Sequence, residues 1–401
     1  MSSPDFNKYE IVFGSFEDSQ GSFPKKIFDE DVVSFLVELS NRLIKNQRAK
    51  NYPDLISFAF WCRATNLRGI KERYALNKTR LGIGTVLHIT PKNVPINFAF
   101  SWAFSLLAGN SNFVKLPSTN FEQIDLFVEI LFEMSETKDY KQITSSSSFF
   151  RTSHDSKVLE SLSIAAEGRV IWGSEETVNA LRKLPSPLRH TELIFPSRYS
   201  ISVLSIDNLL SLKDNEMKVL VSKFIKDSLT FGQRGCSSPR KIFWIGDIHE
   251  LENARLKFWY YANTLVGENI GKGDSYARLN ALASEAINNE AFQIGAKSLQ
   301  SPLIHFLSDY KMNDGIERVL SLGTFQEFHN NSLVDLIPRL DRNVQTVTYF
   351  GIKVSELLSE IIRQGLQGID RIVPFGAAFD MTPVWDGIDT IERLSRVIET
   401  R

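Results

Sequence analysis

The 401 residues are 43% hydrophobic and 23% charged, with a formal net charge of −1, which is the composition of an ordinary soluble globular protein. The mixed charges argue against a nucleic-acid surface or a polybasic membrane anchor, and two distant cysteines argue against a disulfide framework. The six histidines show no ligand spacing, so we expect no bound metal. The length favours two or three domains.

No segment of the chain is typical of export or of membrane insertion. The N-terminus, MSSPDFNKYE, lacks the basic and apolar regions of a signal peptide. The apolar run 94–108 is interrupted by Asn97, Ser101 and Ser105 and is too short to cross a bilayer. We therefore expect a cytoplasmic protein without a membrane span.

Strands and helices alternate through the first half of the chain, after a polar, irregular stretch at 1–30 and an amphipathic helix at 31–44. A serine-rich patch, 144–148, interrupts the alternation. This order predicts a parallel sheet with right-handed crossovers. The expected elements are strands at 81–89, 112–116 and 168–172, a proline-containing loop at 90–96, and helices at 97–108, 120–134 and 175–184.

The same alternation repeats after a crossover at 193–205. We therefore expect two domains of α/β type. The expected elements are helices at 215–229, 250–265 and 354–362, and strands at 241–246, 344–350 and 371–373.

Cys236 lies between an expected helix and an expected strand, within DSLTFGQRGCSSPRKIFWIG. Gly232 and Gly235 permit a tight turn and a close approach to a ligand. The positive charges of Arg234 and Arg240 favour the thiolate, which is the reactive form of cysteine. A free cysteine is more often a small buried hydrophobe, and the spacing alone leaves that alternative open.

No glycine-rich nucleotide motif follows any expected strand. The segment GIGTV, residues 82–86, falls inside a strand and is interpreted as packing. A phosphate group would need another site, such as the helix start at Ser174. Glu175 and Glu176 place negative charge there, and helix capping alone explains Ser174. Cys62 ends an apolar segment and is expected in the core.

Four segments, taken together and in order, resemble the aldehyde dehydrogenase superfamily, and within it most closely the LuxC-type acyl-CoA reductases (fatty-acid reductase). The resemblance covers roughly residues 80–400. The segments are TPKNVPINFAFSWAFSLLAGNSNFVKLPS (90–118), VIWGSEETV (170–178), FGQRGCSSPRKIFW (231–244) and RIVPFGAAFDMTPVWDGID (371–389).

The resemblance implies two Rossmann-like parallel-sheet domains with the active site in the cleft between them. Residues 1–205, completed by 376–401, would bind a nicotinamide cofactor, and residues 206–375 would carry the nucleophilic cysteine. Arg371, Gly376, Trp385 and Asp386 belong to the C-terminal signature, which we expect to pack onto the cofactor domain.

The resemblance also implies a mechanism. Cys236 would attack a thioester carbonyl, and its own N–H and the Asn93 side-chain amide would hold the oxyanion, one such donor being worth roughly 3 kcal/mol. CoA would leave, and a nicotinamide would reduce the resulting thioacyl-cysteine to an aldehyde. Asn93 is also suited to a simple turn.

The same resemblance assigns cofactor contacts. Lys115 and Ser118 would lie near the adenosine ribose, and Gly173 and Ser174 near the pyrophosphate. A 2′-phosphate beside Lys115 implies NADPH, with NADH as the alternative. A lysine at the end of a strand can also simply extend its ammonium to water.

The chain departs from the oxidising members of the superfamily at the general base. Those enzymes have a glutamate in a Glu-Leu-Gly-Gly-Lys stretch, and the corresponding HTELIFPSRYS (190–200) has no Gly-Gly. Glu192 lies nearby, and His190 is an alternative proton carrier. Because hydrolysis would waste a thioacyl intermediate, the missing base favours reduction.

Three alternatives stay open. One is an aldehyde dehydrogenase, either CoA-acylating or hydrolytic. Another is a cysteine acyltransferase or thioesterase that uses no nicotinamide, and the third is a non-catalytic partner-binding protein. The expected partners are an acyl-CoA or acyl-carrier substrate, an acyl-activating or acyl-transferring enzyme, and further copies of the chain in a homo-oligomer.

Overall fold

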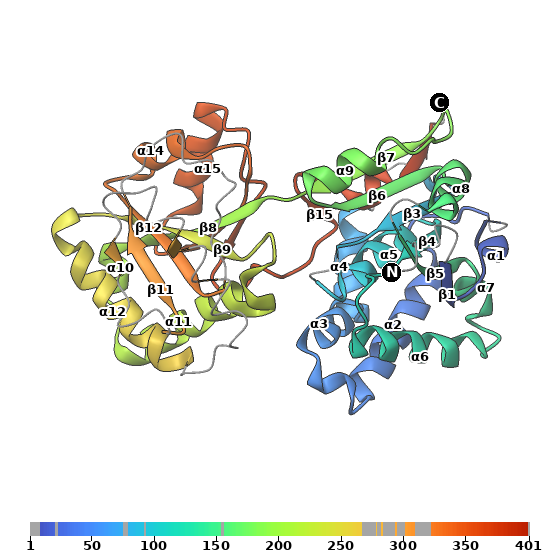
Figure 1. Ribbon diagram of the computed structural model, residues 1–401, viewed down its shortest axis with the longest axis horizontal. Helices are drawn as coiled ribbons and strands as arrows, with labels where there is room; N and C mark the ends of the chain where they lie inside the picture. Colours follow the sequence, from blue (N-terminus) through green and yellow to red (C-terminus); the bar gives the residue numbers. More distant parts are fainter. Residues whose placement is uncertain are drawn as a thin grey trace. The chain divides into compact units, whose positions relative to one another are not determined.

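The computed structural model describes residues 9–20, 23–74, 79–91, 94–153, 156–266, 278, 282–283, 293–294, 301–308 and 322–399. The chain forms two compact units, Met1–Ser197 with Met381–Arg401, and Arg198–Asp380 (Figure 1). Both units are of the α/β class that the sequence predicts.

The boundary between the units differs from the expected residue 205. Strand β8 (Tyr199–Ser205) pairs with strands of the second sheet, so the second unit begins at Arg198. The chain returns to the first unit at Met381 rather than at 376, because the preceding residues hydrogen-bond within the second unit.

The first unit contains a six-stranded sheet in the order β1-β5-β4-β3-β6-β7. Strands β3 to β7 run parallel, and β1 is antiparallel to β5. The strands are β1 (Tyr9–Phe13), β3 (Thr85–Ile89), β4 (Ser111–Lys115), β5 (Ser147–Thr152), β6 (Gly168–Gly173) and β7 (Thr191–Pro196).

Helices cover both faces of this sheet (Figure 1). Every residue of α5 (Asn97–Leu107) is buried, which explains why this helix is apolar on all sides. Phe127 of α6 (Glu122–Ser135) contacts the rings of Phe58 and Trp102 edge-on, at centroid distances of 5.7 and 5.8 Å. The other helices are α1 (Phe16–Gln20), α2 (Glu30–Lys45), α3 (Pro53–Trp61), α4 (Ala64–Arg73), α7 (Lys141–Ser145), α8 (Lys157–Ala165) and α9 (Glu175–Leu181).

The expected strand 81–89 is broken in two. Strand β2 (Thr79–Gly82) pairs with β17 (Ser395–Ile398), and β3 starts only after Gly84. Gly84 has φ +136°, and a Cβ at Gly82 would collide with the carbonyl of Gly109. The glycines of GIGTV therefore serve close packing, as interpreted, but at a break between strands.

Two segments form secondary structure that their composition does not indicate. The N-terminal stretch supplies β1 and α1, and the serine-rich patch runs into β5. Ser147 and Ser148 are buried in β5 because Trp102 Nε1 donates to Ser147 Oγ at 2.8 Å and Ser148 Oγ lies 3.3 Å from Ser19 Oγ. Long-range hydrogen bonds thus allow serines to begin a central strand.

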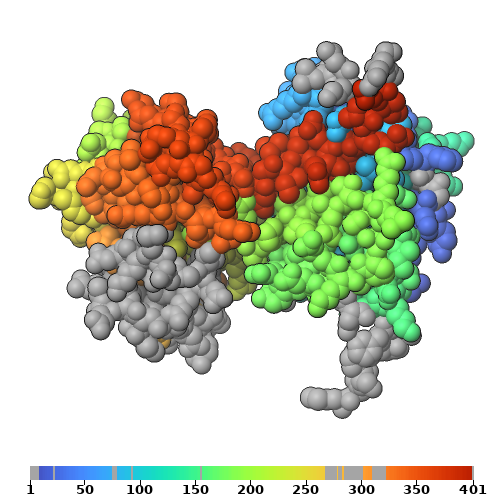
Figure 2. Space-filling model, turned by 90° about the horizontal axis from the view of Figure 1, so that it is seen from above, coloured from blue at the N-terminus to red at the C-terminus, as the bar shows by residue number. Residues whose placement is uncertain are grey.

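The last described residues return to the first unit. Trp385 is buried in its core, and the side-chain amide of Asn110 donates to the Leu394 carbonyl at 2.9 Å. Figure 2 shows this segment in dark red beside the green residues of the same unit. It comprises β15 (Val384–Trp385), β16 (Ile388–Asp389), α16 (Thr390–Arg393) and β17.

The second unit contains a seven-stranded sheet in the order β10-β11-β12-β9-β8-β13-β14, parallel except for β10. Helices α10, α11 and α12 pack with one core cluster and α14 and α15 with another (Figure 1). The strands are β9 (Pro239–Ile245), β10 (Gln293–Ile294), β11 (Ile304–Leu307), β12 (Thr324–Asn330), β13 (Val344–Phe350) and β14 (Arg371–Pro374), and the helices are α10 (Ile206–Leu210), α11 (Asp214–Leu229), α12 (Ile248–Val266), α14 (Leu333–Leu336) and α15 (Val354–Gln364).

A buried carboxylate, Glu327, lies in the middle of β12. It accepts hydrogen bonds from Trp244 Nε1 at 2.8 Å, Trp259 Nε1 at 3.1 Å, and Arg255 at 2.8 and 3.1 Å. His305 Nδ1 lies 2.7 Å from the same carboxylate. Burial acts to raise the pKa of Glu327, but hydrogen bonds and charges of His305 and Arg255 outweigh it and lower the pKa to about 2.

In the first unit, His88 of β3 is fully buried among polar partners. Its Nδ1 lies 2.8 Å from Ser101 Oγ, and its Nε2 lies 3.0 Å from Asn112 Oδ1. Burial lowers the pKa of His88 to about 4, and the hydrogen bond with Asn112 opposes the shift only in part.

We expect His88 to make the free energy of unfolding depend on pH. Between pH 4 and the ordinary histidine pKa of about 6.5, the unfolded chain binds the proton more tightly, so stability rises with pH, by about 3 kcal/mol over the window. Urea unfolding at pH 4.5 and pH 7 gives the change in unfolding free energy with pH for the wild type and for His88→Gln. The wild type should show the larger change. An equal pH dependence in the two proteins would contradict it.

No helix in the described part of the chain is both long enough and apolar enough to cross a membrane.

Candidate functional site

The two cysteines lie in different surroundings. Cys62 follows α3, is fully buried as expected, and has a thiol whose pKa is raised by that burial. Cys236 is partly exposed, in the loop between η2 (Thr230–Gln233) and β9. Of the two cysteines, only Cys236 is partly exposed.

Buried hydroxyl and amide groups fix the backbone around Cys236. The Ser200 hydroxyl donates to the Cys236 carbonyl at 2.6 Å, and Ser237 Oγ donates to Gln345 Oε1 at 3.2 Å. Ser200 follows the first residue of β8, and Gln345 is on β13. The loop is therefore tied to two neighbouring strands of the sheet.

Arg240 is a charged group that acts on the thiol. It is the second residue of β9 and is partly buried, whereas Arg234 is exposed. Burial lowers the pKa of Arg240, and the attraction of the Cys236 thiolate opposes that shift. The same attraction favours the thiolate over the thiol.

Residues 374–380 cover one side of the cysteine loop. The buried carboxylate of Asp227, at the end of α11, accepts from the N–H of Gly376 at 2.6 Å and of Ala378 at 3.1 Å. Burial raises the pKa of Asp227 to about 6. The ring of Phe379 packs at 5.4 Å from that of Phe231.

The unit to which these residues belong corrects one expectation. Arg371 donates to the Ala378 carbonyl at 2.9 Å, and the Gly376 N–H donates to Asp227, so both residues belong to the second unit, whereas Trp385 lies in the core of the first. A Cβ on Gly235 would lie 2.8 Å from the Phe379 ring. Gly235 thus makes room for the Phe379 ring.

The expected cofactor residues lie at the carboxyl edge of the first sheet. Strand β3 has β4 on one side and β6 on the other, because the chain runs from β3 through β4 to β5 and then crosses back. Ligands of open parallel sheets bind outside the carboxyl ends at such a switch point. Lys115 ends β4 and Gly173 ends β6, so the fold brings both residues to this edge.

Lys115 is 5% exposed and has no acidic ion-pair partner in the part of the chain that the structure describes. Its burial lowers the pKa of the ammonium to about 8. The Thr90 hydroxyl, just after β3, donates to the Lys115 carbonyl at 3.0 Å. Ser118 lies in an exposed bend three residues further on. A buried cation without a carboxylate suits an anionic ligand.

Gly173 and Ser174 join β6 to α9. As predicted, Ser174 caps the helix, and its Oγ accepts from Thr177 N at 3.3 Å. A hydrogen bond from Ser174 also lowers the pKa of the Glu176 carboxyl. A Cβ on Gly173 would lie 3.0 Å from Thr177 Cγ2. Helix capping accounts for the Ser174 hydroxyl, and a pyrophosphate contact there stays a prediction.

Neither proton-carrier candidate lies at the carboxyl edge. Glu192, the second residue of β7, pairs with Arg169 at 2.9 Å and with Arg182 at 3.1 Å. His190 precedes the strand, and burial and the charge of Arg169 lower its pKa. In register, Glu192 is opposite Arg169, whereas Pro196 is opposite Gly173 at the carboxyl end. Glu192 is therefore a partly buried ion-pair residue.

The predicted oxyanion residue Asn93 lies outside the described residues. Sequence reasoning also missed the groups that hold the cysteine loop, namely Ser200, Asp227, Gln233, Gln345 and Phe379. No local pattern marks them, because their decisive bonds, such as those of Gln233 with Thr324 and of Asp227 with Gly376, join residues far apart in the chain. Among the described residues, no group of three or more His, Cys, Asp or Glu side chains could hold a metal ion.

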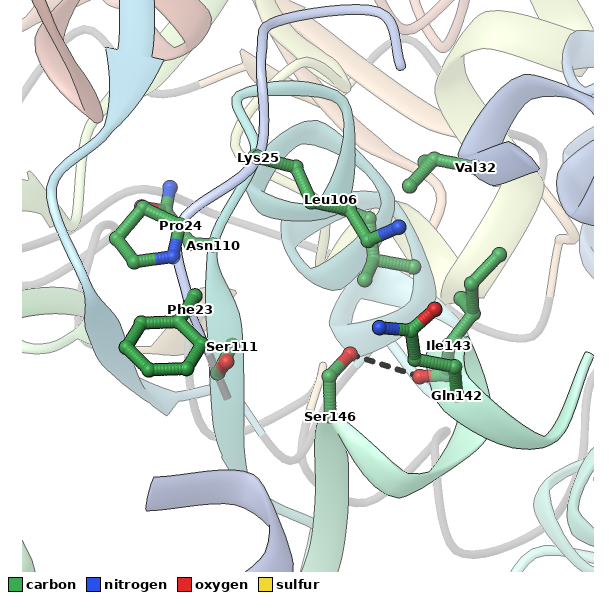
Figure 3. A pocket seen from close by; sticks show the side chains of 11 residues that line it. Phe23, Pro24, Lys25, Val32, Leu106, Asn110, Ser111, Gln142, Ile143 and Ser146 are labelled. Carbon is green, nitrogen blue, oxygen red and sulfur yellow. Dashed lines mark hydrogen bonds between the residues drawn. The ribbon is translucent and has the colours of Figure 1, made fainter. Parts of the chain in front are cut away.

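A hollow of about 340 Å³ lies in the first unit. Figure 3 shows the side chains that line it. Ser111, the first residue of β4, lines it, together with Ser146, which directly precedes β5. Exposed Phe23 lies at the same hollow. This is the amino edge of the sheet, opposite the edge that holds Lys115, so the hollow is separate from the candidate cofactor site.

In fold, the chain is similar to aldehyde dehydrogenases of known structure. Lactaldehyde dehydrogenase from Escherichia coli is 12% identical with a TM-score of 0.61, and the match covers 92% of this chain and 84% of that one. Aldehyde dehydrogenase 21 from Physcomitrella patens, solved with its product succinate, is 12% identical with a TM-score of 0.62, and the match covers 93% of this chain and 84% of that one. A Mycobacterium tuberculosis aldehyde dehydrogenase complexed with NAD+ is 13% identical with a TM-score of 0.62, and the match covers 92% of this chain and 83% of that one.

Such low identities show a shared fold and nothing finer. Among curated proteins, none matches the sequence. The family model for acyl-CoA reductase (LuxC) matches residues 29–259, more than half of the chain, and the matched part includes Cys236 and the first sheet from β3 to β7. The chain therefore belongs to the LuxC acyl-CoA reductase family.

Proposed function

We propose that this protein reduces an acyl thioester to an aldehyde with NADPH, through a thioacyl intermediate on Cys236. One observation carries the proposal: Cys236 is partly exposed on a loop held by buried hydrogen bonds, beside the cation of Arg240. A fixed thiolate is suited to attack a carbonyl. Family membership supplies the reaction type.

In this mechanism the Cys236 thiolate attacks the thioester carbonyl carbon. The oxyanion accepts hydrogen bonds from the Cys236 N–H and from the Asn93 amide. Its collapse expels the CoA thiolate, which takes up a proton, and leaves the acyl group on Cys236. Cys236 would hold the acyl group for reduction by hydride, which a nicotinamide would supply when bound, and the Cys236 thiolate would leave as the aldehyde forms.

The carboxyl edge of the first sheet is the proposed cofactor site. Lys115 and Ser118 would contact the adenosine ribose, and Gly173 and Ser174 the pyrophosphate. Two observations support a cofactor with a 2′-phosphate. Lys115 is buried without an acidic partner among the described residues, and the segment 116–121, LPSTNF, contains no carboxylate. NAD sites commonly use a carboxylate to bind the 2′-hydroxyl, which would repel the phosphate.

The ion pairs of Glu192 favour reduction over aldehyde oxidation. Arg169 and Arg182 hold this carboxylate, so it is not free to activate water. Without a base, the thioacyl bond survives long enough to be reduced.

Mass spectrometry of the intact chain tests the proposal. We expect a panel of acyl-CoAs to give an adduct on Cys236 that disappears, with release of aldehyde, on addition of NADPH. Turnover of the adduct to free acid without NADPH would identify a thioesterase. Formation of acyl-CoA from aldehyde, CoA and NADP+, with no reduction in the other direction, would identify a CoA-acylating dehydrogenase.

We expect Lys115→Met to raise the KM for NADPH at least about tenfold, because one charge-assisted phosphate contact is worth roughly 1.5–3 kcal/mol. The KM for NADH should change much less, since NADH carries no 2′-phosphate. In the wild type, kcat/KM for NADPH should fall as the pH rises through about 8, where the Lys115 ammonium loses its proton. Steady-state kinetics with both cofactors measure these effects. Equal losses for NADPH and NADH would show that Lys115 does not bind the phosphate.

A further inference from the structure

The cysteine loop has a backbone conformation that its own residues do not favour. Phe231, Gly232 and Gln233 have φ values of 57°, 61° and 61°, three left-handed residues in succession. For a residue with a side chain this conformation costs roughly 1–2 kcal/mol. Hydrogen bonds to groups beyond these three residues must therefore stabilise it.

The side-chain amide of Gln233 supplies that stabilisation. Gln233 is fully buried, and its Nε2 donates to the carbonyls of Pro239 at 3.0 Å and Thr324 at 3.2 Å. Its Oε1 accepts from the N–H of Gly323 at 3.0 Å and of Thr324 at 3.3 Å. One amide thus satisfies backbone groups at the first residue of β9 and at the start of β12.

We propose that Gln233 is a positioning residue for the nucleophile: its four hydrogen bonds hold Cys236, three residues further along, beside Arg240 and in the geometry of attack. The inference rests on the proposed function, because it takes Cys236 as the nucleophile. Ser200 and Gln345 anchor the loop at and after Cys236, and Gln233 anchors it before Cys236.

Loss of this amide has consequences for both ends of the loop. Two carbonyls and two N–H groups become unpaired in a buried place, and the left-handed turn relaxes. Cys236 then moves away from Arg240. Misplacement of a reacting group by about 1 Å costs roughly 100-fold in rate, whereas thioester binding is affected less.

The experiment compares the full-length wild type with Gln233→Ala and with the isosteric Gln233→Glu, which keeps the acceptor and loses the amide donors. The first readout is the rate of adduct formation with the acyl-CoA that acylates the wild type fastest. We expect both variants to acylate about tenfold to 100-fold more slowly at saturating thioester, with the KM for the thioester within roughly threefold of the wild type. The second readout is the pH profile of Cys236 alkylation by iodoacetamide, whose midpoint should shift upward as the thiol leaves Arg240.

Asn110→Ala is the matched control. Asn110 is an equally saturated buried amide in the first unit, bonded to Ile83 N, Gly84 N, Ser105 O and Leu394 O. We expect it to lower the melting temperature as the Gln233 variants do, with unchanged acylation and alkylation profiles.

The inference is overturned if Gln233→Glu acylates within roughly threefold of the wild type with the same alkylation midpoint, or if Asn110→Ala alters both readouts as strongly. A wild type that no acyl-CoA acylates would instead refute the proposed function. In that case the alkylation midpoint still decides whether Gln233 positions the thiol.

Discussion

Cys236→Ala is expected to abolish both the acyl adduct and the thioester-dependent oxidation of NADPH, by a factor of about 10⁴ or more. Alanine removes the sulfur that forms the thioester and leaves no other exposed cysteine, since Cys62 is fully buried. Intact-mass analysis detects the adduct, and NADPH absorbance measures turnover. The hydrogen bond from Ser200 to the carbonyl of residue 236 involves only the backbone there, so the loop should keep its fold.

Cys62→Ala is the matched control for this prediction. Its thiol is inaccessible, and the thiol pKa is raised by burial, so the variant should lose stability and keep the adduct. An acyl adduct that persists in Cys236→Ala, or disappears in Cys62→Ala with the protein folded, would place the nucleophile elsewhere.

Glu327→Ala is expected to destabilise the second unit by about 3–5 kcal/mol, because removal of one partner leaves other buried charges uncompensated. Arg255 and His305 would lose their carboxylate, and two indole N–H groups would lose their acceptor. Urea unfolding at pH 7 measures the loss.

The pH dependence of Glu327 has a definite sign. Its folded pKa of about 2 lies below the ordinary value, so its contribution is present at neutral pH and is lost as the pH falls from about 4 toward 2. Glu356→Gln breaks an exposed pair with Lys353 and should cost far less stability than Glu327→Ala. Similar losses in the two variants would show that the buried network contributes no special stability.

Sequence reasoning located the elements whose signals are local. The alternation of strands and helices predicted the α/β class, and Ser174 was recognised as a helix cap because the cap and its acceptor contact lie three residues apart. The family resemblance, drawn from segments in chain order, was confirmed. The exposure of Cys236 agrees with its predicted loop.

Segments rich in polar residues were missed where their partners are distant. Strand β12, TFQEFHN, has no clear apolar alternation, and its central Glu327 is tolerated only because Arg255 and His305 surround it. β1 and β5 were missed for the same reason, since serine and charged residues enter a sheet when remote groups satisfy them.

The sequence by itself determined the class of fold, the family, and the cysteine on which the proposed chemistry depends, because short contiguous segments of sequence indicate each of them. Only the tertiary structure decided that Glu192 is held by Arg169 and Arg182, that Gly235 accommodates Phe379, and that Gln233 bridges β9 and β12. Some tertiary contacts join residues about 150 positions apart, as the hydrogen bond between Asp227 and Gly376 does. Chain topology sets such pairings, and no local spacing encodes them.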